Sequence, residues 1–238
     1  MSITFSKESA LIESHGGIGI DRNLDNVTIA DSNGGVVRHD LSRATEVKAH
    51  CRETKSHLKR EDARVRRTLF CKYGTIEKNR VLWILHNVSA TIVNQAKINS
   101  MAIVMEDIKG IRKLYRKGNG QGSNYRYRLN SWSYYELQRQ IEYKARWEGL
   151  PVVYVDARGT SANCSICGSR TYPNGQRILY CPECDISIDR DVNAARNILA
   201  KAGPRFSPLG GGDEAMKGNP TQTVIPRADA LKMAHRGS

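Results

Sequence analysis

The chain has 238 residues and a formal net charge of +13, and hydrophobic residues make up 39% of it. This length allows one large hydrophobic core or two small ones. Charged residues interrupt every apolar stretch before it reaches membrane-spanning length, and the N-terminus lacks the order of a signal peptide. These features argue against a membrane protein and a secreted protein, and they predict a cytoplasmic protein with reduced cysteines.

The positive charge is concentrated in two segments. Residues 41–80 carry 12 Lys and Arg against 5 Asp and Glu, and residues 109–131 carry 7 basic residues and no acidic one. Clustered positive charge is typical of proteins that bind a phosphate backbone. The alternative is that both segments are simply solvated basic surfaces.

The first hundred residues predict three strands followed by helices. Ile18 and Ile20 alternate with small residues, Val27 and Ile29 do so again, and "DSNGG" predicts a hairpin turn before a third strand. From Ser42 to about residue 72 the pattern is polar and helical, and "YG" at 73–74 predicts a break. Beyond it, apolar residues at helical spacing predict a core-facing helix: Val81, Leu85, Val88, Ile92 and Ala96.

The second half predicts strands that alternate with helices. Residues 101–108 read as a strand that ends on two acids, 109–131 as a basic glycine-rich loop, and 151–155 as a buried strand. Between the loop and the last strand, Ser133 and Glu136 have the spacing of a capping box for a helix that Gly149 ends. A cysteine-containing segment and a helix from about residue 190 to residue 200 follow. The order predicts an α/β fold with a mixed sheet and flanking helices, analogous to ribonuclease H.

Acidic residues stand at the ends of three predicted core elements. Asp21 follows the first strand, Glu106 closes the fourth, and Asp189 and Asp191 open the last helix. Three converging carboxylates can bind two Mg²⁺ ions, which can activate water against a phosphodiester. Each acid alone could be a turn residue or a favourable acid at a helix start. Spacing does not decide between Glu106 and Asp107, or between Asp189 and Asp191.

Four cysteines form a C-x2-C-x13-C-x2-C pattern. They are Cys164, Cys167, Cys181 and Cys184. Two such pairs joined by a hairpin predict a structural zinc ribbon, with an iron centre or a redox pair as the alternative. Cys51 and Cys71 stand alone in helical sequence and are expected to be ordinary thiols.

Several motifs in one order resemble the TnpB-type (OrfB) transposon-encoded proteins, which are relatives of type V CRISPR effector nucleases. They include "GIGIDRNLDNVTIA", "GTSANCSICGS", "YCPEC" and "DRDVNAARNIL", and the resemblance spans about residues 17–200. It implies a RuvC-like nuclease with Asp21, Glu106 and Asp191 as catalytic acids. It also implies that the ribbon holds target DNA and that a guide RNA selects the target.

With this resemblance the chain divides into five parts. They are an N-terminal segment (1–16), a RuvC-like core (17–158) with a basic helical insert (41–98), a zinc ribbon (159–188), a final helix (189–202) and a disordered tail (203–238). Family proteins usually carry a longer N-terminal part that grips the guide. Only 20 residues precede Asp21 here, so we expect the nuclease half alone: a fragment, an internally started product or a decayed gene.

The expected function is that of a Mg²⁺-dependent DNA endonuclease in the cytoplasm, associated with the nucleoid. Basic and aromatic residues of the glycine-rich loop are predicted to contact nucleic acid: Arg112, Lys113, Arg116, Lys117, Tyr125, Arg126, Tyr127 and Arg128. That loop could instead be a solvated connection. The alternative function is a truncated nucleic-acid-binding protein that regulates or competes with a full-length relative. A strand-transfer transposase is a weaker option, because we find no tyrosine or serine nucleophile motif.

Overall fold

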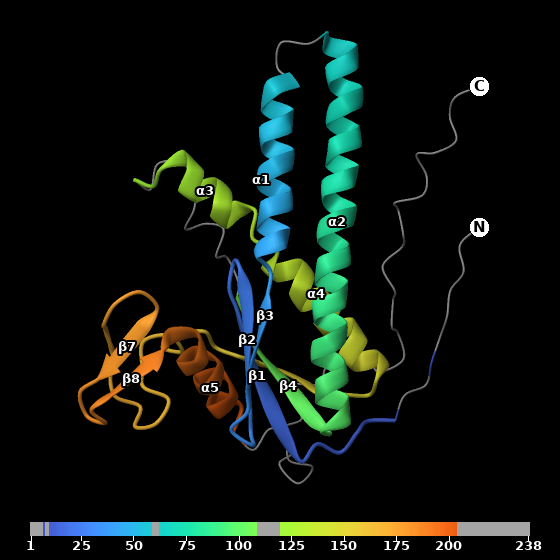
Figure 1. Ribbon diagram of the computed structural model, residues 1–238. Coiled ribbons are helices and arrows are strands. Elements are labelled where there is room, and N and C mark those ends of the chain that lie inside the picture. The colour runs from blue at the N-terminus through green and yellow to red at the C-terminus, as the bar shows by residue number, and fades with distance from the viewer. Residues whose placement is uncertain (1–6, 8–9, 59–61, 109–119, 204–238) are drawn as a thin grey trace.

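The computed structural model describes residues 7, 10–58, 62–108 and 120–203. They form an α/β fold in which helices cover both faces of a mixed five-stranded sheet, and a small three-stranded sheet lies beside it (Figure 1). The predicted mixed sheet with flanking helices is confirmed at this level. No helix in these ranges is both long and apolar enough to cross a membrane.

The large sheet has the strand order β3-β2-β1-β4-β5. Its strands are β1 (Gly16–Arg22), β2 (Asn26–Asp31), β3 (Val36–Asp40), β4 (Met101–Glu106) and β5 (Val152–Val155). The first three are an antiparallel meander, as the alternation predicts, whereas β1, β4 and β5 run parallel. The central strand β1 is buried along its whole length, so both of its faces need a covering layer.

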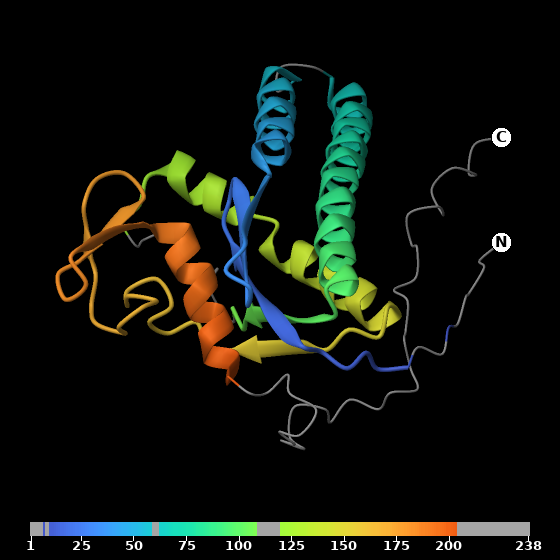
Figure 2. The ribbon, with the colours of Figure 1, turned by 60° about the horizontal axis from the view of Figure 1, so that its bottom comes forward.

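Side chains of β1 alternate between two different layers. Ile18 and Ile20 point into the main hydrophobic core, formed with the helices α1 (Ser42–His57), α2 (Ala63–Ile98) and α4 (Tyr134–Trp147). The opposite face is covered by one helix, α5 (Arg190–Ala202), which packs on β1, β2, β4 and β5. Figures 1 and 2 show α5 on one side of the sheet and α2 with α4 on the other.

The helical hairpin of α1 and α2 corrects the predicted break at residues 73–74. Helix α2 runs through Gly74 without interruption, and its start is set by Asp62, whose side chain accepts hydrogen bonds from the backbone N–H groups of Arg64 and Val65. A glycine inside a helix costs only about 1 kcal/mol relative to alanine, which a 36-residue helix tolerates. The predicted core positions further along are buried or partly buried.

Two further predictions change in the segment before α4. Helix α3 (Ser123–Asn130) occupies part of the expected basic loop, whereas residues 109–119 lie outside the described ranges, as do residues 204–238 of the predicted tail. The predicted capping box at the start of α4 is wrong. Ser133 Oγ accepts a hydrogen bond from Lys48 Nζ, and Glu136 instead binds Arg139, one turn further along the helix. The helix does end where Gly149 adopts a φ of 74°.

Candidate metal sites

Three acidic residues meet at one edge of the large sheet. Strands β1 and β4 are parallel neighbours with Ile20 opposite Met105, so Asp21 and Glu106 follow side by side at their carboxyl ends. Alternation places both on the face that α5 covers. The first turn of α5 adds Asp191, which is 3% exposed.

Asp21 sits in an environment that disfavours its negative charge. It is 8% exposed, and burial raises its pKa to about 7, with the charges of Glu106 and Asp191 acting in the same direction. The side-chain amide of Asn23 opposes the shift by donating a hydrogen bond to Asp21 Oδ2 over 2.7 Å. A cation at this edge would relieve the repulsion among the three carboxylates.

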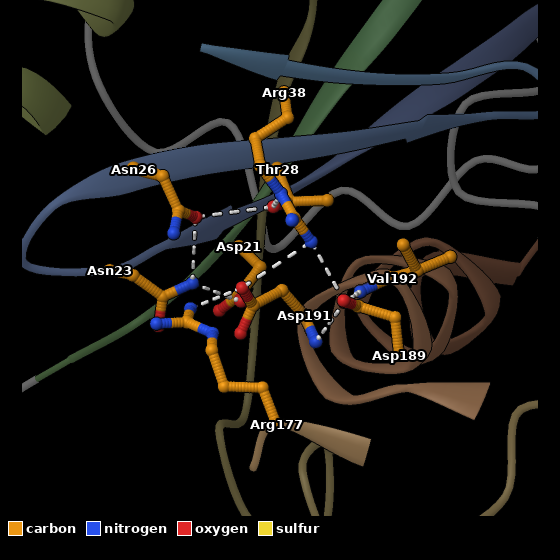
Figure 3. Close-up of polar contacts among 9 residues, drawn as sticks. All are labelled: Asp21, Asn23, Asn26, Thr28, Arg38, Arg177, Asp189, Asp191 and Val192. Carbon is orange, nitrogen blue, oxygen red and sulfur yellow. Dashed lines mark hydrogen bonds and ion pairs between the residues drawn. The ribbon is translucent and has the colours of Figure 1, made fainter. Parts of the chain in front are cut away.

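The two aspartates at the start of α5 have different roles. Asp189 caps the helix, because its Oδ1 accepts from the backbone N–H groups of Asp191 and Val192. Asp191 points toward the sheet edge, where Arg177 donates a hydrogen bond to it and Arg38 lies 3.6 Å away (Figure 3). The geometry therefore favours Asp191 over Asp189 as the inward acid. Arg177 is its direct ion-pair partner, whereas Arg38 bonds to Asp189 over 2.8 Å and only approaches Asp191.

Glu106 is oriented by a residue that lies between β5 and the cysteine segment. The buried hydroxyl of Thr160 donates a hydrogen bond to Glu106 Oε1. The backbone carbonyl of Glu106 accepts a hydrogen bond from Arg22 Nη2 over 2.5 Å. These contacts, together with the electrostatic influence of Glu106 on Asp21, favour Glu106 over Asp107 as the acid of the edge.

Arg22 is a functional candidate that the sequence reasoning missed. It is 2% exposed and follows Asp21 directly, but it points to the opposite face and binds Gln138 Oε1 over 2.5 Å on α4. Burial lowers the pKa of its guanidinium group, while the charge of Glu106 opposes that shift. The signal in "GIGIDRN" was an arginine directly after the acid that ends an apolar strand, which indicates a cation buried next to that acid.

The four cysteines form a closed cluster beside α5. The ligand atoms of Cys164, Cys167, Cys181 and Cys184 all lie within 4.8 Å of one another, and the sulfur atoms of Cys167 and Cys181 are 3.5 Å apart. Four sulfur atoms at about 2.3 Å from a tetrahedral zinc ion would lie about 3.8 Å apart, so the cluster fits such an ion. Hydrogen bonds from Ser169 lower the pKa of the Cys167 thiol to about 6. Burial raises the pKa of the Cys181 thiol, and the hydrogen bond with Cys167 raises the pKa of the Cys184 thiol to about 12, so without an ion the cluster favours a single thiolate.

Among the described residues, the cysteines are the one group of potential metal ligands with this close spacing. The three carboxylates lie farther apart, and Arg177 binds one of them. The cysteine cluster is thus preformed for a metal ion. The acid edge has the right donor atoms for Mg²⁺, but Asp191 would have to exchange its arginine partner for the ion.

The cysteine cluster and the acid-bearing helix are joined without a linker. Cys164 and Cys167 lie before β6 (Tyr172–Pro173), Cys181 ends β7 (Ile178–Cys181), and Cys184 lies in the turn before β8 (Ile186–Asp189). Helix α5 starts at the residue after β8. Asn193 on α5 is fully buried and bonds to the first cysteine turn, accepting from the Ser165 backbone N–H over 2.8 Å and donating to the Asn163 carbonyl over 2.7 Å.

The predicted nucleic-acid contacts are placed only in part. Arg112, Lys113, Arg116 and Lys117 lie outside the described residues. The other four are on α3, where Tyr125 is 54% exposed. Arg126 donates to the Gln121 carbonyl, Arg128 pairs with Asp25 over 3.0 Å, and the Tyr127 hydroxyl donates to the Lys48 carbonyl over 3.1 Å. Three of these four side chains therefore already have partners within the chain.

Comparison with solved structures defines the class of the fold. The described chain superimposes on the protein in the cryo-EM structure of a Cas12f1–sgRNA–target DNA complex with a TM-score of 0.60 and 19% sequence identity, covering 84% of this chain and 52% of that one. A family model described as "Cas12f1-like, TNB domain" matches residues 134–198, which include α4, β5, the cysteine cluster and most of α5. The fold of the chain therefore resembles that of Cas12f1.

Sequence comparison then shows the family. Over 191 residues the chain is 38% identical to the TnpB-like protein MJ0751 of Methanocaldococcus jannaschii, covering 77% of this chain and 68% of that protein. The chain belongs to the family of TnpB-like proteins, as the sequence motifs predict. It is also 40% identical over 116 residues to the CRISPR-associated endodeoxyribonuclease Cas12f1 of Sulfoacidibacillus thermotolerans, covering 48% of this chain but only 25% of that protein.

Proposed function

We propose that this chain is a RuvC-like, Mg²⁺-dependent DNA endonuclease whose cysteine cluster binds a structural zinc ion. The observation that carries the proposal is the meeting of Asp21, Glu106 and Asp191 at one sheet edge, at the ends of two parallel strands and the start of α5. The relative Cas12f1 is itself named an endodeoxyribonuclease. The strand order, with three antiparallel strands followed by two parallel ones, supports a RuvC-like sheet.

The residues of the edge have separate roles in this proposal. Mg²⁺ bound by the three carboxylates would supply activation of the attacking water and stabilisation of the leaving oxygen. Asp21 must be ionised to take part, and Asn23 fixes the direction of its carboxyl group. Thr160 does the same for Glu106. Without a cation, Arg177 pairs with Asp191, and Arg38 lies between Asp189 and Asp191; with a cation bound, these two guanidinium groups would be released to bind a phosphate group.

DNA and a guide RNA are the partners that we propose. The net charge of +13 suits a polyanion, and the cryo-EM structure that shares this fold is described as a complex of Cas12f1 with sgRNA and target DNA. A location in the cytoplasm, next to the nucleoid, belongs to the same proposal.

The first test is cleavage of labelled single-stranded DNA by the purified chain with Mg²⁺. We expect Asp191→Ala and Asp21→Ala to reduce the cleavage rate roughly 10²- to 10³-fold while DNA binding is retained, because the carboxylates act on the developing charge of the transition state. Asp107→Ala is the control, because it removes a neighbouring acid outside the proposed set.

A nucleic-acid-binding protein without nuclease activity is the second candidate. It is favoured by one observation, the ion pair that Asp191 forms with Arg177 while Arg38 lies 3.6 Å away. Equal rates for the wild type and both alanine variants, with intact DNA binding, would support this candidate and reject the nuclease.

Zinc binding is tested separately by metal analysis of the purified protein. We expect about one zinc ion per chain in the wild type and nearly none in Cys164→Ser or Cys181→Ser, because a tetrahedral site with three thiolates is much weaker. Cys51→Ser is the matched control, since Cys51 is also buried but lies on α1, outside the cluster. Full zinc retention in the two cluster variants would refute the ribbon.

A further inference from the structure

A pocket of about 440 Å³ lies among the helices on the side of the sheet opposite α5. Its walls come from α1, α2, α3, the segment that joins α3 to α4, and the first turn of α4. Its walls include neither the three acids of the sheet edge nor the four cysteines, so the nuclease proposal gives the pocket no role.

Three aromatic side chains line this pocket. Tyr135 is 62% exposed, Trp132 packs at a tilt on Tyr134 with the ring centroids 5.0 Å apart, and Tyr127 lies 4.0 Å from the guanidinium group of Arg52. Aromatic walls of this kind stack planar unsaturated rings. The contact between Arg52 and Tyr127 adds a cation beside the same wall.

The polar groups of the pocket suit a base better than a phosphate. Glu77, Glu136 and Lys48 line it together with the amide of Asn130. The two carboxylates are paired with Lys55 over 2.8 Å and with Arg139 over 2.7 Å, and the Lys48 ammonium donates hydrogen bonds to the Ser131 carbonyl and to Ser133 Oγ, so the lysine of the wall is already engaged within the chain. Carboxylate oxygens can accept hydrogen bonds from the exocyclic amino groups of cytosine, adenine or guanine.

The pocket is connected to the acid edge through one residue. Trp132 Nε1 donates a hydrogen bond to the backbone carbonyl of Asn23 over 2.8 Å, and the side chain of Asn23 binds Asp21 over 2.7 Å. Hydrogen bonds from Trp132 through Asn23 to Asp21 therefore join one wall of the pocket to the acid edge.

We propose that this pocket binds one unstacked nucleobase of a single strand, with a preference for bases that carry an exocyclic amino group. This proposal rests on the proposed function, because the bound strand is the one that would be presented to Asp21, Glu106 and Asp191. Binding of the base itself does not require cleavage. DNA and RNA offer the same base chemistry, so the test includes both.

The test is a binding titration at pH 8 without added Mg²⁺ and without chelator, with oligo-dC, oligo-dT and an abasic strand of equal length, and with the matching RNA strands oligo-rC and oligo-rU. We expect Tyr135→Ala to weaken binding of oligo-dC or oligo-rC roughly 5- to 100-fold, which is the range for loss of one base–aromatic stack. Trp83→Ala is the matched control, because Trp83 is also 62% exposed but lies on α2 outside the pocket, and it should bind like the wild type. The abasic strand should bind all three proteins alike.

A second variant tests the base preference. Glu77→Gln should reduce the preference for cytosine over thymine or uracil, since a carboxylate is replaced by an amide that also donates. The proposal is overturned if Tyr135→Ala and Trp83→Ala bind oligo-dC and oligo-rC alike, or if Tyr135→Ala weakens the abasic strand equally. Whichever of oligo-dC and oligo-rC loses more affinity in Tyr135→Ala shows whether the pocket binds a DNA strand or an RNA strand. No step of this binding test requires Mg²⁺, so it is independent of cleavage. If the chain does not cleave DNA but Tyr135→Ala weakens base binding, this proposal stands and the nuclease proposal fails. If the chain cleaves DNA but Tyr135→Ala binds like the wild type, only this proposal fails.

Discussion

Replacing Gly19 with alanine is expected to destabilise the fold by about 3 kcal/mol or more. A Cβ at this position would lie 2.2 Å from the carbonyl oxygen of Ala195 and 2.8 Å from the backbone nitrogen of Leu199. Both are backbone atoms of α5, so the clash cannot be relieved by turning a side chain. The helix would have to move away from β1, and Asp191 would move with it. Urea unfolding measures the loss.

Gly74→Ala is the matched control for this substitution. Gly74 lies inside α2, and a Cβ there would meet no atom within 4 Å. The same chemical change should therefore stabilise the protein, by up to about 1 kcal/mol. If the two variants unfolded at the same urea concentration, that result would refute a close contact between α5 and β1 at Gly19.

Replacing Asp21 with asparagine is expected to stabilise the metal-free protein at pH 8 by up to roughly 4 kcal/mol. The pKa of Asp21 is about 7 in the folded protein and 3.8 as the ordinary value. Between these two values the folded protein keeps a proton that the unfolded chain has lost. The stability contributed by Asp21 is therefore complete below about pH 4 and is lost as the pH rises through 7. Asparagine has no charge to bury, so the variant should lack this pH dependence.

Unfolding curves at pH 4.5 and pH 8, each with and without Mg²⁺, measure this effect. The wild type and Asp21→Asn should differ little at the lower pH and strongly at the higher one. Mg²⁺ should stabilise the wild type at pH 8 and have a much smaller effect on the variant. Asp25→Asn is the control, because Asp25 is 38% exposed and forms a surface ion pair with Arg128. An equal gain from Asp21→Asn at both pH values would contradict a buried, raised-pKa carboxyl group.

Short-range patterns predicted a large part of this fold. The alternation around Ile18 and Ile29 specified the strands of the meander, because a strand with one buried face repeats every two residues. The cysteine spacing located a compact cluster, since each pair already brings two thiols together within one turn. The acids were predicted from their positions at the ends of elements, and the structure brings Asp21, Glu106 and Asp191 to one edge.

Long-range contacts explain what the sequence could not provide. Ser133 has the spacing of a capping residue, but Lys48 from α1 takes its hydroxyl group. Arg177 is 14 residues from Asp191 and becomes its partner only because the hairpin of β7 and β8 folds back onto α5. The choice between Asp189 and Asp191 likewise depends on how α5 is seated on the sheet, which no local pattern contains.

The contact between Gly19 and α5 also has a consequence for how the protein is made. The central strand β1 leaves the ribosome well before α5, which covers one of its faces and is the last described element. Until α5 emerges, that face of the nascent sheet is uncovered, and only chaperones or rapid folding protect it from aggregation. Asp191 arrives with the same helix. The acid edge is therefore complete only when the sheet is closed, and an unfinished chain carries just two of its three carboxylates.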